Sequence, residues 1–458
     1  MKTTGTRSLI LFLLAAGFFL GLGVFLYGLA TEGGKWAVQP FNGHISGTGV
    51  SSGEGRVLDR NGNVLAQTKD GKRVYSSDYA TRCALVHAVG DTQGNIAAGV
   101  QYQYRSELSG YNFVTGLVSP TGKSNGCDVA LTLDSSLCRL ARQKLNGRNG
   151  AAAVYNYKTG ELLCMVSTPD FDPQNPPKDL ATNSAYSGAY LNKVISSTFT
   201  PGSIFKVVTS AAAVENIANL DSRTWLSNGS VVINGNRITD LGSYGKLNFQ
   251  QALAKSSNVV FSQVAVEVGA PKLQAEANRM GFNRSFSLDG IDAAKSSYNV
   301  SSAAPDELGW SGVGQYTDMV NPFHMLVLMG AVANGGTPVM PYLVKSVTTP
   351  VGIPVRAGAA KTGAELVQPS TAARLQTYMR YDVTREYGDS LFPGLSVCAK
   401  TGTAEVGGGK KPNCWMIGFS QNESTPYAFV VLVENTSGSV ATAGRVAGAL
   451  MTAAAGVK

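Results

Sequence analysis

A serine that lies three residues before a lysine can act as a nucleophile without histidine, because the lysine amine can take the hydroxyl proton. The two side chains meet only on a helix, where residues three apart share a face. The sequence contains this pair at Ser203–Lys206 and at Ser243–Lys246. The stretch PGSIFKVVTSAAAV (201–214) predicts a helix that begins just before Ser203, whereas Gly245 disfavours a helical turn at the second pair. We therefore expect Ser203 to be the nucleophile, at a helix N-terminus that favours a developing oxyanion, and Lys206 to be the base.

A lysine serves as a base at neutral pH only when its pKa lies well below the ordinary value of about 10.4. Burial lowers the pKa of an amine, and so does a second cation nearby. The apolar neighbours Phe205, Val207 and Val208 indicate that Lys206 is buried. We expect the second cation to be Lys400.

A polar pair of the form Ser-x-Asn occurs three times, beginning at Ser256, Ser297 and Ser420. Ser256 and Asn258 lie just before the apolar run VVFSQVAVEVG, which predicts a helix. Their polar groups would therefore project from the start of that helix. Ser297 lies in a stretch that resembles a loop, and Ser420 ends an apolar strand. We therefore expect Ser256 and Asn258 to join the site.

The tripeptide Lys-Thr-Gly also occurs three times, beginning at Lys158, Lys361 and Lys400. The sequence places Lys158 at the tip of a predicted hairpin and Lys361 in a polar loop rich in Ala and Gly, where each is an ordinary turn residue. The third copy continues an apolar strand, and an edge strand of this composition can bind an extended peptide by strand addition. Its lysine and hydroxyl groups would hold a carboxylate, so we assign substrate binding to Lys400, Thr401, Gly402 and Thr403.

The composition excludes several other kinds of chemistry. The three histidines, His44, His87 and His324, are too few and too scattered for a zinc site or a Ser-His-Asp triad. The six cysteines include no Cys-x-x-Cys pair, which argues against zinc ribbons, iron–sulfur ligation and thioredoxin-type chemistry. No Walker-type phosphate loop is present. We expect no metal and no cofactor.

A stretch without charge, from Ser8 to Ala30, is long enough to cross a membrane as a helix. The apolar part of a cleaved signal peptide would be only about 7–15 residues long, so we expect an uncleaved anchor. Lys2 and Arg7 precede this stretch, and the positive-inside rule therefore places the N-terminus in the cytoplasm and residues 31–458 outside the cell. That topology excludes nucleic acid as a partner, and the net charge of +8 then fits a solvated surface or an anionic cell envelope.

The remaining patterns predict an α/β protein in which both ends of one domain close a single antiparallel sheet. Two apolar runs joined by a turn predict one hairpin, and three apolar runs near the C-terminus predict three more strands. Between them lies a mostly helical stretch, roughly 180–390, that would form a second lobe. The predicted segments are a linker at 31–54, a small α/β module at 55–126, strands at 151–157, 161–167, 396–401, 414–420 and 427–434, and a helix at 441–455.

With these residues identified, the chain resembles the class B penicillin-binding proteins, and its short extracellular part resembles their compact penicillin-binding protein A type. Two departures from the usual family pattern are Glu54-Gly55 in place of Arg-Gly and the residues Val313 and Tyr316 within Ile-Gly-Gln-Gly. The resemblance rests on GRVLDRNGNVLA (55–66), GAAAVYNYKTGELLCMVSTPDFDP (150–173), TFTPGSIFK (198–206), LAKSSNVVF (253–261), GVGQYTDMVNPFHMLVLMGAVANGG (312–336) and KTGTAE (400–405).

This resemblance implies a monofunctional D,D-transpeptidase that cross-links peptidoglycan stem peptides through an acyl-enzyme on Ser203 and is inactivated by β-lactams. It implies that Ser256 relays a proton to the leaving amine and that Asn258 orients the substrate amide. It also implies a five-stranded antiparallel sheet flanked by helices, on a small pedestal, and a partner membrane glycosyltransferase of the shape, elongation, division and sporulation family. The corresponding divisions are a cytoplasmic tail (1–7), an anchor (8–30), a linker (31–54), a pedestal (55–126) and a transpeptidase domain (127–458).

Three alternatives share the same residues. A membrane-anchored β-lactamase would deacylate with water, but the Glu-x-x-Leu-Asn segment of glutamate-dependent serine β-lactamases is missing. A D,D-carboxypeptidase would transfer the acyl group to water, and the sequence separates it poorly from a transpeptidase. A non-enzymatic penicillin-sensing domain would need several membrane spans and a cytoplasmic effector, whereas only about seven residues precede the anchor.

Overall fold

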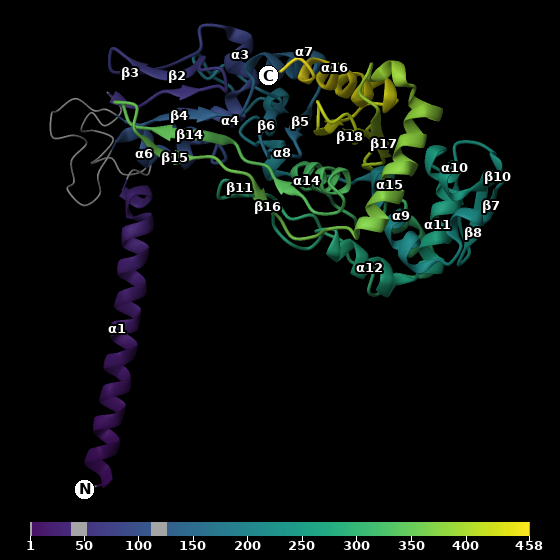
Figure 1. The fold of residues 1–458 in the computed structure, drawn as a ribbon, viewed down its shortest axis with the longest axis horizontal. Helices are drawn as coiled ribbons and strands as arrows, with labels where there is room; N and C mark the ends of the chain where they lie inside the picture. Colours follow the sequence, from purple (N-terminus) through teal and green to yellow (C-terminus); the bar gives the residue numbers. More distant parts are fainter. Residues whose placement is uncertain (1, 38–52, 111–125, 458) are drawn as a thin grey trace.

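One long helix projects from a folded body in the computed structural model, which describes residues 2–37, 53–110 and 126–457 (Figure 1). Helix α1 spans Lys2–Ala37, and its segment Gly5–Leu29 is exposed, apolar and long enough to cross a membrane once. The helix is therefore compatible with a single-pass anchor. It also continues beyond the predicted boundary at Ala30, so the first part of the predicted linker is helical, and residues 38–52 of that linker lie outside the described residues.

The pedestal is a six-stranded sheet whose strands come from three separate parts of the chain, in the order β15-β14-β4-β1-β2-β3. Four short helices accompany it: α3 (Tyr79–Ala84), α4 (Val86–Val89), α5 (Val100–Gln103) and α6 (Arg105–Ser109). The strands are β1 (Val57–Leu58), β2 (Val64–Lys69), β3 (Lys72–Tyr75), β4 (Asp128–Leu131), β14 (Val344–Thr348) and β15 (Pro354–Ala357).

The predicted domain boundary, between residues 126 and 127, separates strands that belong to this one sheet. Strand β4 pairs in parallel with β1, with Val57 opposite Val129, and antiparallel with β14. Both β4 and β14 belong to the predicted transpeptidase domain by sequence position but to the pedestal sheet by hydrogen bonding. Pairing between distant strands depends on contacts that a local pattern does not record. Residues 111–125 of the predicted module lie outside the described residues.

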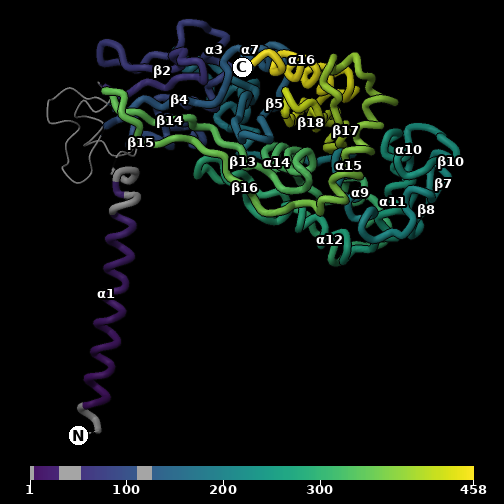
Figure 2. Tube along the Cα trace, viewed as in Figure 1, coloured from purple at the N-terminus to yellow at the C-terminus, as the bar shows by residue number. Residues whose placement is uncertain are grey.

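The second sheet has five antiparallel strands in the order β17-β18-β19-β5-β6, which confirms the predicted sheet built from both ends of the domain. Figure 2 shows the teal β5 beside the yellow-green C-terminal strands. Strand β17 forms one edge and pairs only with β18 within the sheet. The strands are β5 (Gly150–Asn156), β6 (Leu162–Thr168), β17 (Val397–Ala404), β18 (Asn413–Ser420) and β19 (Tyr427–Val433).

Helices cover both faces of the five-stranded sheet. Helix α14 (Pro322–Ala333) packs against β18, β19 and β5, and α7 (Ser135–Leu145) and α16 (Arg445–Ala454) pack together on the sheet, on the opposite side in Figure 1. Every residue of α14 from Pro322 to Val332 is buried, as expected of a helix that is apolar on all sides. The side chain of Asp134 accepts hydrogen bonds from Ser136 N and Leu137 N and so begins α7.

The predicted helical stretch contains both helices and pairs of short strands. The helices are α8 (Lys193–Ser196), α9 (Lys206–Asn216), α10 (Phe249–Ala254), α11 (Asn258–Val268), α12 (Ala270–Arg279), α13 (Pro305–Gly312) and α15 (Pro369–Asp382). The strands are β7 (Thr224–Ser227) with β10 (Gly245–Asn248), β8 (Ser230–Ile233) with β9 (Asn236–Thr239), β11 (Ser287–Leu288) with β12 (Ile291–Asp292), and β13 (Val339–Met340) with β16 (Lys361–Thr362). Two of these pairs, β8–β9 and β11–β12, are hairpins around the turns Asn234-Gly235 and Asp289-Gly290, whereas β7–β10 and β13–β16 join segments farther apart in the sequence.

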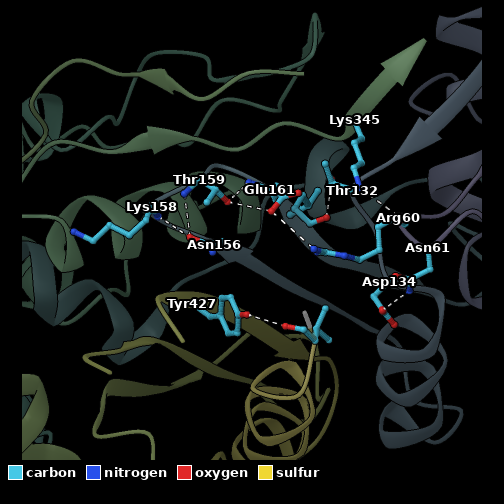
Figure 3. Close-up of polar contacts among 12 residues, drawn as sticks. Arg60, Asn61, Thr132, Asp134, Asn156, Lys158, Thr159, Glu161, Lys345 and Tyr427 are labelled. Atoms are coloured by element: carbon cyan, nitrogen blue, oxygen red, sulfur yellow. Dashed lines mark hydrogen bonds and ion pairs between the residues drawn. The ribbon is translucent and has the colours of Figure 1, made fainter. Parts of the chain in front are cut away.

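Two of the three Lys-Thr-Gly copies lie in surface turns or short strands. The first occupies the turn between β5 and β6, where Asn156 Oδ1 accepts hydrogen bonds from Lys158 N (2.8 Å) and Thr159 N (3.0 Å) (Figure 3). The second includes the exposed strand β16 instead of the predicted loop, because Lys361 and Thr362 pair with β13. Figure 3 also shows the junction with the pedestal, where Asn61 donates a 3.0 Å hydrogen bond to Asp134.

We predict that Gly330→Ala destabilises the fold, because a Cβ on this α14 residue would overlap the buried hydroxyl of Tyr155 on β5. Overpacking of this kind costs about 1–3 kcal/mol. Thermal or urea unfolding of the full-length protein in detergent measures the loss. Gly456→Ala is the matched control, because the nearest atom to a Cβ there lies 3.4 Å away. Equal stability of the two variants would contradict the packing of α14 on β5.

Candidate active site

Ser203 lies on a tight turn that leads directly into a helix. Residues Gly202–Phe205 form a 3₁₀ turn, and α9 continues from Lys206. Gly202 has φ +55°, and a Cβ there would lie 2.5 Å from the carbonyl oxygen of Thr403. Glycine therefore lets the turn that carries Ser203 pack against strand β17.

The buried amine of Lys206 is the centre of the site. Its Nζ lies 3.0 Å from Ser203 Oγ, 3.2 Å from Ser256 Oγ, 2.6 Å from Ser256 O and 2.8 Å from Asn258 Oδ1. The side chain of Lys206 has no solvent exposure. Burial lowers the pKa of Lys206 well below its ordinary value, and the charge of Lys400 lowers it further. The geometry therefore places an amine able to accept a proton beside the hydroxyl of Ser203.

Ser256 occupies a strained turn just before α11. Its φ is +54°, in the left-handed region that a residue with a Cβ rarely adopts, and such strain persists only when the surroundings hold it in place. Ser257 caps α11 by accepting a hydrogen bond from Val260 N. In this turn, Ser256 Oγ lies between two amines, at 3.2 Å from Lys206 Nζ and 3.1 Å from Lys400 Nζ.

Asp240 holds this turn in place. Its Oδ2 accepts 2.6 Å hydrogen bonds from Ser227 Oγ and Ser257 Oγ, and its Oδ1 accepts a 3.0 Å bond from Val259 N. Sequence reasoning did not identify Asp240, because it lies between β9 and β10 in a segment without a recognised motif. Its role depends on the packing of β9 and β7 against α11, which only the folded chain brings about.

Strand β17 carries the third Lys-Thr-Gly copy along the free edge of the sheet. Lys400 is fully buried, and its Nζ donates 3.1 Å hydrogen bonds to Ser256 Oγ and to Thr401 O. Burial lowers the pKa of Lys400 to about 8. Tyr387 OH accepts a 3.2 Å hydrogen bond from Thr401 N, and Ser439 Oγ donates a 2.6 Å bond to Gly402 O. These contacts hold the strand beside the turn that carries Ser203.

A cavity of 370 Å³ opens onto these groups. The buried amines of Lys206 and Lys400 contact Ser256, which lines the cavity, and Gly402 lies on β17 between two other lining residues. The structure therefore brings all eight predicted site residues together. A larger cavity of 650 Å³, near β11 and β16, contains none of them. The residues of the smaller cavity that the sequence singled out are Ser203, Ser256, Asn258, Thr401 and Thr403.

The other motif copies lie elsewhere in the fold. Ser243 precedes β10, where Gly245 has φ +71°, so this serine is not on a helix. Ser297 forms a backbone bridge with Met319, and the buried Ser420 donates a 2.7 Å hydrogen bond to Leu395 O. None of these three serines lines the 370 Å³ cavity.

The chain is similar to known proteins over most of its length. The family model described as "Penicillin binding protein transpeptidase domain" matches residues 150–453. The peptidoglycan D,D-transpeptidase PbpA of Mycolicibacterium smegmatis is 30% identical over 308 residues, which cover 62% of this chain and 62% of that protein. The stage V sporulation protein D of Bacillus subtilis is 26% identical over 436 residues, or 86% of this chain and 66% of the relative.

Solved structures share the fold over most of the chain. The ceftriaxone acyl-enzyme complex of penicillin-binding protein A from M. tuberculosis superposes with a TM-score of 0.78 at 24% identity, covering 89% of this chain and 99% of that one. The D,D-transpeptidase domain of a peptidoglycan glycosyltransferase from Eggerthella lenta gives a TM-score of 0.76 at 26% identity, with the same two coverages, 89% and 99%.

We predict that Asp240→Ala lowers the free energy of unfolding by at least about 2 kcal/mol, because it leaves three donors without their acceptor. Urea unfolding of the full-length protein measures the change. Asp292→Ala provides the control, since this exposed aspartate on β12 should shift stability by less than about 0.5 kcal/mol. A loss at Asp240 no larger than the loss at Asp292 would show that the turn does not depend on this carboxylate.

Proposed function

Because the chain belongs to the penicillin-binding protein transpeptidase domain family, we propose that it is a peptidoglycan D,D-transpeptidase. It cross-links stem peptides through an acyl-enzyme on serine. The relative from Mycolicibacterium smegmatis carries this activity in its name, and the match spans 62% of that protein's length. The observation that carries the proposal is the contact between Lys206 Nζ and Ser203 Oγ at 3.0 Å, with Ser256 Oγ beside the same amine.

Acylation begins when Ser203 Oγ attacks the carbonyl carbon of the penultimate D-alanine of a pentapeptide stem. The hydroxyl proton moves to the neutral amine of Lys206, and the Oγ–C bond forms as the carbonyl oxygen becomes an oxyanion. The backbone N–H groups of Ser203 and Thr403 would bind that oxyanion, and each such donor contributes about 3–4 kcal/mol in comparable enzymes. A lysine with an ordinary pKa would be charged at neutral pH and unable to accept the proton.

The tetrahedral intermediate then breaks its C–N bond and releases the terminal D-alanine as an amine. That nitrogen needs a proton, which Lys206 returns through the hydroxyl of Ser256, 3.2 Å from its Nζ. The acyl group remains on Ser203 Oγ as an ester. An amine from a neighbouring stem then attacks the ester carbonyl and loses a proton to Lys206 through Ser256. The C–Oγ ester bond breaks as the new amide forms, and Lys206 returns the proton to Ser203 Oγ.

The substrate lies along the free edge of β17. An extended donor peptide would add to this edge by strand pairing, and Asn258 would orient its amide. The terminal carboxylate is held by the charge of Lys400 and by hydroxyl groups of Thr401 and Thr403. Gly402 lets the turn that carries Ser203 approach the strand closely, because a Cβ there would lie 2.8 Å from Pro201 O. The rings of β-lactams present a carboxylate and a carbonyl in a comparable arrangement, so we expect them to acylate Ser203 and inactivate the enzyme.

Helix α1, which among the described residues is the helix long and apolar enough to cross a membrane, would anchor this enzyme. We place residues 1–7 in the cytoplasm and the pedestal and catalytic domain on the outer side, where peptidoglycan is assembled. Polymerisation of the glycan strand would fall to a partner membrane glycosyltransferase of the shape, elongation, division and sporulation family.

Labelling by a fluorescent penicillin, followed by peptide mapping, tests the proposed function. We predict that full-length protein in detergent carries a stable label on the peptide that contains Ser203, because the site has no group assigned to activate water. Ser203→Ala should lose the label, whereas Ser243→Ala and Ser297→Ala should keep it. A label that persists on Ser203→Ala would overturn the choice of nucleophile. A label that turns over within seconds would instead indicate a β-lactamase.

A further inference from the structure

A cavity of 650 Å³, which we call the junction cavity, has no role in the reaction described above. It shares no lining residue with the 370 Å³ cavity that Ser203 lines. Residues from three segments form its wall, 284–290, 340–342 and 356–364. Figure 1 shows β11, β15 and β16, which belong to or overlap these segments, at the junction between the pedestal and the catalytic domain. The volume is typical of sites that bind small molecules in proteins, about 300–1,000 Å³.

Close contacts hold the three segments together around the junction cavity. Asp289 Oδ2 accepts hydrogen bonds from the backbone N–H groups of residues 343–344, at 2.7 and 2.8 Å. Its Oδ1 lies 3.3 Å from the guanidinium of Arg356 on β15. A Cβ at Gly358 would lie 2.6 Å from the ring of Tyr342, so the second and third segments also pack directly against each other. The cavity is therefore enclosed by segments that contact one another.

Positive charge predominates on the wall of the junction cavity. The described residues that line it include the cationic side chains of Arg284, Arg356 and Lys361 and the carboxylate of Asp289. Asp289 is already occupied by two backbone N–H groups and by Arg356. No ion pair joins Arg284 or Lys361 to any residue that the structure describes. Two cations on this wall are therefore available to a negatively charged ligand.

Arg284 combines partial burial with an unpaired donor. Its Nε is buried and donates no hydrogen bond to any residue within the described ranges. Its guanidinium lies 5.1 Å from the centre of the Phe286 ring, and burial lowers the pKa of Arg284, although arginine stays charged in proteins. A buried donor without an acceptor calls for an explanation. Because a guanidinium presents its donors as a planar fork that matches the two oxygens of a carboxylate, a carboxylate is the group that this side chain is suited to bind.

The rest of the wall suits a short peptide with small side chains. Ala357, Ala359 and Ala364 contribute methyl groups, and Gly290 and Gly358 leave their backbone uncovered by side chains. Strand β15 forms one edge of the pedestal sheet, where an extended peptide can pair with backbone groups. The combination of cations, methyl groups and a strand edge therefore matches a peptide that ends in a free carboxylate.

We propose that the junction cavity is a second binding site, which takes the C-terminal carboxylate of a short peptide between Arg284 and Lys361. The peptide of this chemistry that the proposed reaction would meet is a stem that ends in D-alanine, so the choice of peptide rests on the proposed function. The site itself does not, since its residues are separate from Ser203 and the other catalytic groups. A stem bound there would hold peptidoglycan on the enzyme while the catalytic cavity stays free.

Saturation-transfer NMR, which observes a small ligand bound to a large protein, tests the site on full-length protein in detergent. Penicillin is added first, so that the acyl group occupies the catalytic cavity, and the excess is removed by dialysis. The probe is N-acetyl-D-alanyl-D-alanine, and its C-terminal amide is the matched ligand without a carboxylate. We expect the amide to bind more weakly by about tenfold or more, because it loses hydrogen bonds to charged groups.

Variants of the two cations locate the binding. Arg284→Gln combined with Lys361→Gln should weaken binding of the carboxylate probe by about tenfold or more. Lys144→Gln combined with Lys272→Gln is the control, because it removes two exposed lysines on α7 and α12, outside the cavity, and lowers the net charge equally. Penicillin acylation and thermal melting of the cavity variant should match those of the wild type.

Lys361→Glu keeps the test decisive if the double variant does not fold. The side chain of Lys361 is exposed, so its replacement leaves the packing intact, and the reversed charge should weaken binding of the carboxylate probe by about tenfold or more. Wild-type affinity in a folded Lys361→Glu protein would overturn the site.

The remaining outcomes separate the site from the proposed function. Equal binding of the carboxylate and amide probes, or equal affinities of the cavity variant and the control, would overturn the site. Inorganic phosphate that binds more tightly than the peptide probe would overturn the choice of a peptide and indicate a phosphate group instead. Failure of penicillin to acylate the wild type would overturn the proposed function, whereas the dependence of binding on Arg284 and Lys361 would still decide the site in the unacylated protein.

Discussion

The site is organised by two buried lysine amines that meet at one serine hydroxyl. Ser256 Oγ lies 3.2 Å from Lys206 Nζ and 3.1 Å from Lys400 Nζ, and both amines are shielded from water. Burial lowers the pKa of Lys206 well below its ordinary value, and the charge of Lys400 lowers it further. In the proposed reaction, this lysine with its lowered pKa takes the role that histidine has in other serine enzymes.

Three segments distant in the sequence must meet to build that arrangement. Helix α9 supplies Lys206, the strained turn before α11 supplies Ser256, and edge strand β17 supplies Lys400. The five-stranded sheet fixes β17 by pairing it to β18 along its whole length, and the glycine at position 202 lets the serine turn approach its backbone. Asp240 and Tyr387 then hold the turn and the strand through hydrogen bonds.

The sequence was sufficient to predict the helices and strands of the site that depend on local residue patterns. The helix after Ser203, the helix start at Ser256 and the apolar strand before Lys400 each follow from residue spacing. They separated the motif copies that lie together in the fold from the copies that lie elsewhere. The sheet was predictable because its strands are long and apolar. The pedestal sheet was not, since β4 pairs with β1 and β14 through contacts that no local pattern encodes. Asp240 was missed for the same reason, because only the folded chain brings it to the turn that carries Ser256.

Replacement of Lys206 by arginine tests the central claim, that a neutral lysine takes the proton of Ser203. Arginine keeps a long cationic side chain but has a pKa above about 12 and does not accept a proton in a protein. Stopped-flow acylation by penicillin, with melting curves to verify folding, should show Lys206→Arg to be folded and slower by about two to four orders of magnitude. A folded variant that acylates within about tenfold of wild type would contradict the account, because it would show that the positive charge of Lys206, and not proton transfer, is what the reaction needs.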